Sequence, residues 1–159
     1  MNKSRKTARI VGVIYMIGIL SGMTRYFLLT PILEAPDYLI QVSANENRVI
    51  IGSLFFFISA FLIAGVAIVM YPILKKYNEA LALGFSGLRF IEAVCAIVGS
   101  IGLLTLLTLS QELSNAGAPG DSYFQTVGTA VLAIRDWAFM IGSGLVWSLS
   151  ALILNYILY

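Results

Sequence analysis

Two charged residues inside an apolar segment are the first candidates for chemistry in this chain. Arg89 and Glu92 stand three residues apart within residues 80–110, a segment that carries no other charge. Side chains at i and i+3 share one face of a helix, so the guanidinium and the carboxylate can meet. They lie roughly 13 and 18 Å along a helix starting near residue 80, close to the middle of a hydrocarbon layer about 30 Å thick. A lone charge there costs about 2.5–3.5 kcal/mol, so the sequence predicts that both are paired or functional.

Three further charged residues fall at membrane depth and complete a set of candidate site residues. The candidates for binding or for a polar core are Arg25, Arg89, Glu92, Arg135 and Asp136. One hypothesis is a site for a ligand, an ion or a proton. The alternative is a structural role, in which the charges hold the helices in register as a polar residue does in a coiled coil. Arg135 and Asp136 are adjacent, about 100° apart on a helix, so we expect them to have different partners.

The pairing of these charges depends on the register of the last helix. If residues 137–159 form the span, Arg25 and Glu92 lie at similar depth. We then predict Glu92 as the hub of the polar core, with Arg25 or Arg89 as its ion-pair partner. If the span instead begins at residue 123, Asp136 moves level with Arg89 and these two form the central pair.

The chain lacks the residues that most catalytic sites require. The chain has no histidine and a single cysteine, Cys95, so the commonest general base, the commonest metal ligand and a disulfide framework are all missing. It contains no HExxH, CxxC, GxSxG or Walker sequence. The sequence therefore disfavours an enzyme, and we expect no metal site, no cofactor and no nucleic-acid partner.

The elements that must position these residues are transmembrane helices. The chain is 59% hydrophobic and 11% charged, whereas a soluble domain has about 25% charged residues. This composition predicts an all-α, polytopic membrane helical bundle, a single domain over residues 1–159 with four transmembrane helices. We expect spans at about 10–30, 48–74, 80–110 and 137–159, with residues 122–136 as an outer helical extension.

Charge asymmetry predicts the orientation of the bundle. Six basic residues fall at one end of the predicted spans: Lys3, Arg5, Lys6, Arg9, Lys75 and Lys76. The other end has a single basic residue, Arg48, among several acids. Because Lys and Arg are enriched in cytoplasmic segments, we predict that both termini are cytoplasmic.

Prolines and polar segments mark where the spans end. Pro31 should end the first span, and Pro72 should bend or end the second in its last turn. Residues 32–47 and 111–121 are expected to be outer connections. The second of these contains three residues that break helices: Gly117, Pro119 and Gly120.

Capping patterns and glycines add local detail. Residues 43–46 and 122–125 each fit a capping box, so a helix should begin at each of them. Residues 142–144, Gly-Ser-Gly, are the expected bend in the last helix. Gly18 and Gly22 form a GxxxG pair that predicts helix packing, either a dimer seam or, as we favour, close packing within the bundle.

Four stretches stand out in the order of the predicted spans. They are KTARIVGVIY at residues 6–15, NxxRxxIG at 45–52, LALG leading to LRFIEA over 81–93, and RDWAFxIG leading to NYILY over 135–159. Together they resemble a bacterial membrane family catalogued as domain of unknown function 4386, and the resemblance covers nearly the whole chain. The Arg89–Glu92 and Asp136–Trp137 pairs are its most specific parts.

The resemblance implies a multi-pass protein of the bacterial plasma (inner) membrane and gives Arg89, Glu92 and Asp136 priority among the candidates. It implies no activity. Members of the family are usually longer, with what look like two further spans, so we expect a short or truncated member. Missing helices would leave one face of the bundle open to a dimer partner or to lipid.

These observations lead to two expected functions. The first is binding of a lipid or other amphiphile, or passage of a small solute, through a polar intramembrane pocket. The second is a non-catalytic structural or partner subunit whose buried charges only fix helix register. Membrane lipids are the expected partners, with a homo-oligomer and a small amphiphilic ligand as further hypotheses. Three arginines against two acids leave the candidate set with one positive charge, which suits an anionic head group only weakly.

Overall fold

Four long helical segments make up almost all of the chain. The computed structural model describes residues 3–116 and 122–159. The first three long segments are α1 (Lys3–Leu33), α3 (Glu46–Leu74) and α4 (Glu79–Ala116). The fourth is continuous and consists of α5 (Ser122–Phe139), a π-helical segment η1 (Met140–Val146) and α6 (Trp147–Leu158). A short helix, α2 (Tyr38–Ala44), follows α1.

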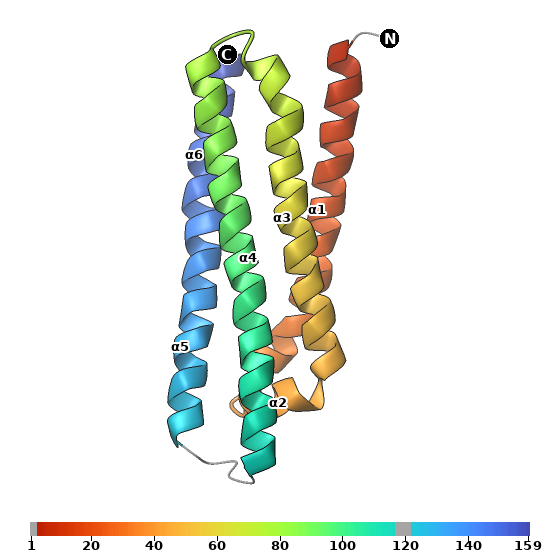
Figure 1. Cartoon of the computed structure of the whole chain (residues 1–159). Coiled ribbons are helices and arrows are strands. Elements are labelled where there is room, and N and C mark those ends of the chain that lie inside the picture. The colour runs from red at the N-terminus through yellow and green to blue at the C-terminus, as the bar shows by residue number, and fades with distance from the viewer. Residues whose placement is uncertain (1–2, 117–121) are drawn as a thin grey trace.

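Each long segment is long and apolar enough to cross a membrane, which confirms the predicted bundle with four spanning helices. The segments alternate in direction, so that both termini and the turn between α3 and α4 lie at one end (Figure 1). We call this end the terminal end. The opposite end, which holds α2, we call the α2 end. The cytoplasmic placement of the termini stays a prediction.

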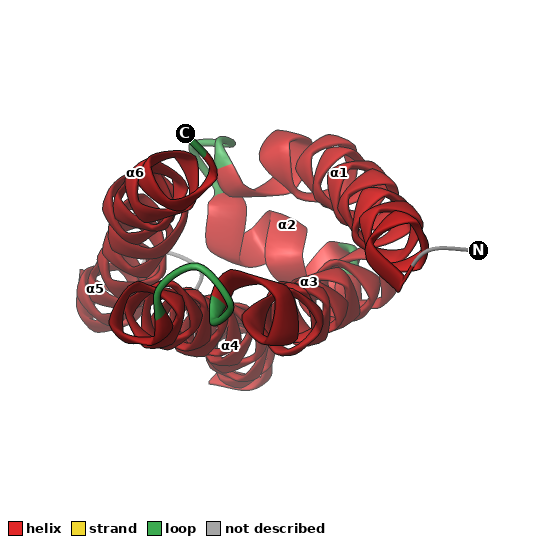
Figure 2. Ribbon diagram, turned by 90° about the horizontal axis from the view of Figure 1, so that it is seen from above, coloured by secondary structure: helices red, strands yellow, loops and turns green. Residues whose placement is uncertain are grey.

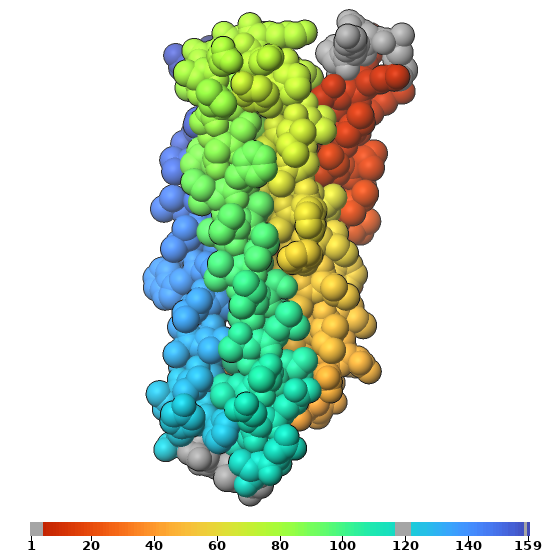
Figure 3. Space-filling view, in the orientation of Figure 1, coloured from red at the N-terminus to blue at the C-terminus, as the bar shows by residue number. Residues whose placement is uncertain are grey.

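The four segments form an open arc rather than a closed ring. Helix α1 packs on α3, α3 on α4, and α4 on α5, η1 and α6. Among the described residues, α1 and α6 make no extensive contact with each other. Viewed along the helices, α1 and α6 are the two ends of the arc (Figure 2). Helices α3 and α4 lie side by side along one whole face of the molecule (Figure 3).

Apolar side chains are buried in three clusters along this arc. One lies at the terminal end, around Phe85 and Leu74. A second joins α1, α3 and α4 around Phe56 and Leu103. The third holds α2 and α5 against α4 around Leu39 and Leu106. The α2 end therefore has a buried core built from more segments than the open terminal end.

The predicted outer connections are shorter than expected. Residues 38–44 form α2 because Leu39 and Val42, three residues apart, share one face and are fully buried. Helix α4 continues to Ala116, so residues 111–116 are helical and not a loop. The expected breakers Gly117, Pro119 and Gly120 lie outside the described residues.

The local signals at helix ends gave mixed results. Helix α3 ends two residues after Pro72, as predicted, whereas α1 continues through Pro31 to Leu33. A helix begins at Ser122, as predicted. The predicted capping box at residues 43–46 does not form, because the residue before α3 is Asn45 and it provides no side-chain cap. Ser43 instead shares a hydrogen bond of 3.1 Å with Ser114 of α4.

Candidate functional site

The Arg89–Glu92 ion pair that the spacing predicts is present and buried. Arg89 donates a hydrogen bond of 2.7 Å from Nη1 to Oε2 of Glu92, and the two side chains are only 4% and 6% exposed. Arg89 also donates from Nη2 to the hydroxyl of Tyr15 on α1. The pair lies within one helix, and the bond to Tyr15 connects Arg89 to a neighbouring helix.

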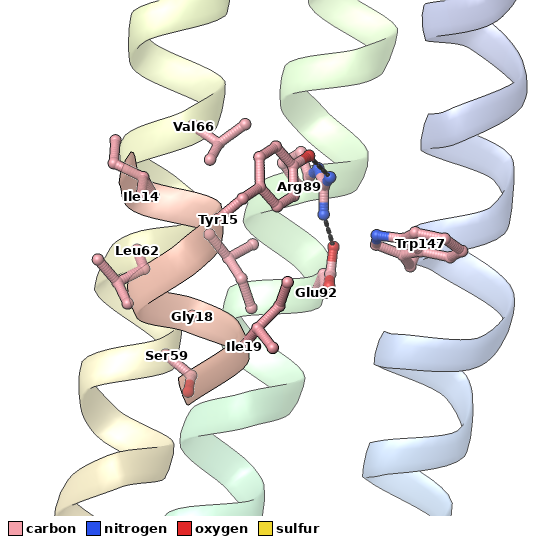
Figure 4. A pocket seen from close by; sticks show the side chains of 11 residues that line it. Ile14, Tyr15, Gly18, Ile19, Ser59, Leu62, Val66, Arg89, Glu92 and Trp147 are labelled. Carbon is pink, nitrogen blue, oxygen red and sulfur yellow. Dashed lines mark hydrogen bonds and ion pairs between the residues drawn. The ribbon is translucent and has the colours of Figure 1, made fainter. Parts of the chain in front are cut away.

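This pair forms one wall of a cavity of about 200 Å³. Figure 4 shows the ion pair and Tyr15 turned toward the space between α1, α4 and α6, with the indole of Trp147 on the opposite side. The polar lining residues are Tyr15, Ser59, Arg89, Glu92 and Trp147. The remaining lining is Ile14, Gly18, Ile19, Leu62, Ile63 and Val66. A cavity with a polar wall and an apolar wall can hold both parts of an amphiphilic molecule.

The cavity exists because α1 and α6 do not pack together. Helices α1 and α3 supply the apolar wall and Tyr15, α4 supplies the ion pair, and α6 supplies Trp147. The space therefore lies on the side where the arc of helices is open (Figure 2).

The π-helical segment sets the direction of Trp147. Arg135 and Trp147 are twelve residues apart, which in a regular helix would leave them about 120° out of phase. A π turn absorbs about one extra residue, so the offset falls to about 20°. The segment covers residues 142–144, where the sequence predicted a bend. Both side chains consequently turn toward the inside of the arc.

A glycine at position 142 allows η1 to approach α4 at the level of the ion pair. A Cβ atom at Gly142 would lie 2.6 Å from the Cβ of Cys95 and 3.6 Å from the carbonyl oxygen of Glu92. No side chain fits there without displacing α4. Gly144, two residues later, has no atom within 4 Å of such a Cβ among the described residues.

Arg25 does not pair with Glu92, so that alternative is wrong. The Cζ atom of Arg25 lies 3.7 Å from the centroid of the Phe56 ring and 5.4 Å from that of Phe139. These aromatic residues belong to α3 and α5, farther from the terminal end than Glu92 is. The reason is helix length: α1 starts at Lys3, which lowers Arg25 to about 33 Å from the terminal end.

Arg135 and Asp136 bind each other, contrary to the expectation that they have different partners. Nη1 of Arg135 lies 3.1 Å from Oδ1 of Asp136. The arginine side chain is long enough to bridge the 100° between neighbouring positions. The alternative Arg89–Asp136 pair does not form among the described residues, where the Asp136 side chain is 65% exposed.

The GxxxG pair of α1 does not pack within the bundle. Among the described residues, no atom lies within 4 Å of a Cβ placed at Gly18 or at Gly22. This contradicts the interpretation that we favoured, close packing inside the chain. The alternative, a dimer seam, stays a prediction.

Sequence reasoning missed three residues of the cavity: Tyr15, Ser59 and Trp147. The observed helix starts explain why Tyr15 meets Arg89. Tyr15 follows the start of α1 by twelve residues and Arg89 follows the start of α4 by ten, whereas the predicted first span began only at residue 10. At about 1.5 Å per residue this places the two at similar depth. The sequence carried no signal for Ser59 or Trp147.

The fold and the site define a helical membrane protein with a polar cavity among its spanning helices. A family model described as Domain of unknown function (DUF4386) matches residues 10–159. The chain belongs to this family, as the resemblance implied. Comparisons with curated proteins and with solved structures found no match. The family description assigns no activity, so function must be argued from the cavity.

Proposed function

We propose that this protein binds the polar head of a membrane amphiphile in the cavity between α1 and α6. One observation carries the proposal: a buried ion pair and an apolar wall line the same cavity on the open side of the bundle. An amphiphile dissolved in the bilayer could enter sideways, with its head against Arg89 and Glu92 and its chain along α1.

The chemistry of the wall favours a head group without net charge. Arg89 and Glu92 neutralise each other, so an additional full charge in the cavity would have no counter-ion on this wall. Glu92 accepts the bond from Arg89 through Oε2, and among the described residues no donor reaches Oε1. A hydroxyl group of the ligand can donate to this oxygen and accept from Trp147.

The volume limits how much of the ligand enters. About 200 Å³ corresponds to roughly six or seven water molecules at about 30 Å³ each. This accommodates a small head group and the start of one chain. The rest of the chain would remain in the bilayer, which is open to the cavity on this side.

The alternative of a purely structural charge set is weaker for this pair. An ion pair that fixes the register of two helices must join them, whereas Arg89 and Glu92 both belong to α4. Among the described residues, the charged pair reaches a second helix through the hydrogen bond from Arg89 to Tyr15, while Ser59 of α3 shares a separate hydrogen bond with Ser21 of α1. A buried ion pair confined to one helix therefore needs another reason to be present, and ligand binding supplies one.

Binding can be measured by native mass spectrometry of the protein in neutral detergent. The probes are monoolein, whose head is neutral and carries hydroxyl groups, and oleate and oleylamine, which carry opposite charges. We expect monoolein to bind more tightly than either charged probe. The Arg89→Met/Glu92→Leu double variant removes the polar wall while leaving no stranded charge, and it should bind monoolein at least tenfold more weakly.

Two controls separate a site from nonspecific adhesion. Glu112→Gln changes an exposed acid on the same helix and should leave monoolein binding unchanged. Trp147→Leu should weaken binding without touching the ion pair. Equal binding of monoolein by the natural protein and the double variant would disprove the proposal.

A further inference from the structure

We infer a second site, in which Arg25 of α1 and Arg135 of α5 together bind the anionic phosphate group of a lipid head or of free phosphate. It is separate from the cavity at Glu92. It lies farther from the terminal end, at the level where Phe139 closes over Arg25. The inference does not depend on the proposed function.

The two arginines carry more positive charge than their surroundings neutralise. Among the described residues, Arg25 has no acidic partner and contacts the uncharged rings of Phe56 and Phe139. Arg135 pairs with the mostly exposed Asp136, and its Nε atom is buried without a hydrogen-bond partner. Arg25 contacts Phe139, which follows Arg135 by four residues on α5, so the two arginines lie about one helical turn apart at the same face of α5. Two arginines and one carboxylate leave a single uncompensated positive charge.

The packing around Arg135 holds its stem in place. A Cβ atom at Gly102 of α4 would lie 3.2 Å from the Cβ of Arg135. The glycine lets α5 approach α4 closely, so that the first carbons of the Arg135 side chain pack against α4. The face of Phe56 supports the guanidinium group of Arg25. The base of one side chain and the head of the other are thus in place before any ligand binds.

The depth of the pair brings both long side chains within reach of the lipid head groups at the α2 end. Arg25 lies 22 residues after Lys3 and Arg135 lies 23 residues before Leu158, about 33 and 35 Å from the terminal end at about 1.5 Å per residue. The hydrocarbon layer is about 30 Å thick. The predicted first span begins at residue 10, so Arg25 lies about 22 Å into this layer, and its long side chain can extend toward the interface at the α2 end. Tyr26 and Trp137, 61% and 65% exposed, flank them as interfacial aromatic residues do.

The chemistry of the pair selects phosphate. A guanidinium group offers parallel donors that match the oxygens of a phosphate, and it is weakly hydrated, so it can bind such an anion in a partly buried place. A phosphodiester carries one negative charge, which equals the excess at this site. It would accept bonds from the terminal nitrogens of the two guanidinium groups and reduce the repulsion between the arginines.

Native mass spectrometry and thermal unfolding in neutral detergent test this inference. The probes are phosphatidylglycerol, diacylglycerol, which lacks the phosphate, and inorganic phosphate. In the Arg89→Met/Glu92→Leu background, where the site for neutral heads is removed, we expect phosphatidylglycerol to bind at least tenfold more tightly than diacylglycerol and to raise the unfolding temperature. Arg25→Gln and Arg135→Gln should each reduce this binding at least tenfold. Arg48→Gln, which removes an equal charge from an exposed position of α3, should change it less than twofold.

Comparing the lipid probe with inorganic phosphate distinguishes the source of the anion. A stabilisation produced by phosphatidylglycerol but not by inorganic phosphate assigns the site to a lipid head. A stabilisation by inorganic phosphate that both glutamine variants abolish assigns it to free phosphate. Equal binding of phosphatidylglycerol by the natural protein and both glutamine variants would overturn the inference. If a glutamine variant does not fold, Arg25→Lys or Arg135→Lys replaces it, because lysine keeps the charge but loses the paired donors.

Monoolein provides an independent check. Its binding at the Glu92 cavity should be the same in Arg25→Gln and in the natural protein. The proposed function and this inference can therefore fail separately.

Discussion

Arg89 and Arg25 are both arginines at membrane depth, yet their surroundings differ completely. Arg89 has a carboxylate one turn away on its own helix and a tyrosine hydroxyl across from it. Arg25 faces aromatic rings and a second arginine. The charges of the first site neutralise each other within the chain, whereas the second site carries excess positive charge. A neutral site suits an uncharged polar head, and a positive one requires an anion from outside the chain.

The orientation of the bundle in the membrane decides which leaflet each site faces. Cysteine labelling tests it with an all-or-none result, because each introduced cysteine either reacts in intact cells or does not. In a Cys95→Ser background, a cysteine introduced by Ser114→Cys near the end of α4 should react with an impermeant reagent in intact cells. One introduced by Asn78→Cys, in the turn beside Lys75 and Lys76, should react only after permeabilisation, because the basic end is predicted to be cytoplasmic. The reverse labelling pattern would place the Arg25 site in the cytoplasmic leaflet.

Removing the acid of the neutral site should have the largest effect on stability. Glu92→Gln leaves Arg89 buried with its positive charge unpaired, which in soluble proteins costs about 3–5 kcal/mol of unfolding free energy. Unfolding in detergent would measure the loss. Adding Arg89→Met should recover part of it, since the stranded charge is then gone. Glu112→Gln on the same helix serves as the control. If Glu92→Gln and Glu112→Gln lower the unfolding free energy by equally small amounts, the Arg89–Glu92 pair is not buried in the membrane.

The π-helical segment between the two sites should be sensitive to a single methyl group. Gly142→Ala places a Cβ 2.6 Å from that of Cys95, so we expect a loss of about 1–3 kcal/mol from overpacking. Gly144→Ala has open space and should be neutral or gain up to about 1 kcal/mol from helix propensity. Thermal unfolding compares the two. If the Gly142 variant is no less stable than the Gly144 variant, η1 does not approach α4 this closely.

The positive site should show the smallest effect on stability. Arg25→Met loses contacts with two aromatic rings but relieves the repulsion of Arg135. In phosphate-free neutral detergent we expect a change of less than about 1 kcal/mol, because a cation–π contact is itself worth about that much. Arg89→Met, which strands Glu92, should cost several times more. A loss for Arg25→Met as large as that for Arg89→Met would indicate an anionic partner for Arg25 already present in the protein.

Interactions between near neighbours in the sequence could be predicted, and those between helices mostly could not. The Arg89–Glu92 pair follows from i, i+3 spacing on one helix, and the irregularity at residues 142–144 follows from two glycines. The prediction that Arg135 and Asp136 have different partners failed. It followed from the direction of their Cβ atoms, whereas the length of the arginine side chain lets the two residues pair.

The pairing of residues on different helices failed for a general reason. Inside a membrane, an apolar side chain that faces lipid has the same character as one that faces another helix. The apolar residues of α1 therefore gave no sign of which face is turned inward, and the Gly18–Gly22 pair was assigned to a contact that does not form. The cavity residues Tyr15 and Trp147 were missed for the same reason.

The sequence by itself determined that this protein is a bundle of membrane-spanning helices, because long apolar segments can satisfy their backbone only as helices in lipid. It also determined that α4 carries its own ion pair. Only the tertiary structure decided that α1 and α6 stay apart, that Glu92 therefore faces a cavity, and that Arg25 lies against two aromatic rings rather than an acid. These outcomes depend on helix lengths, on a π turn that rotates α6 and on close approach at Gly102 and Gly142, none of which apolar patterning encodes.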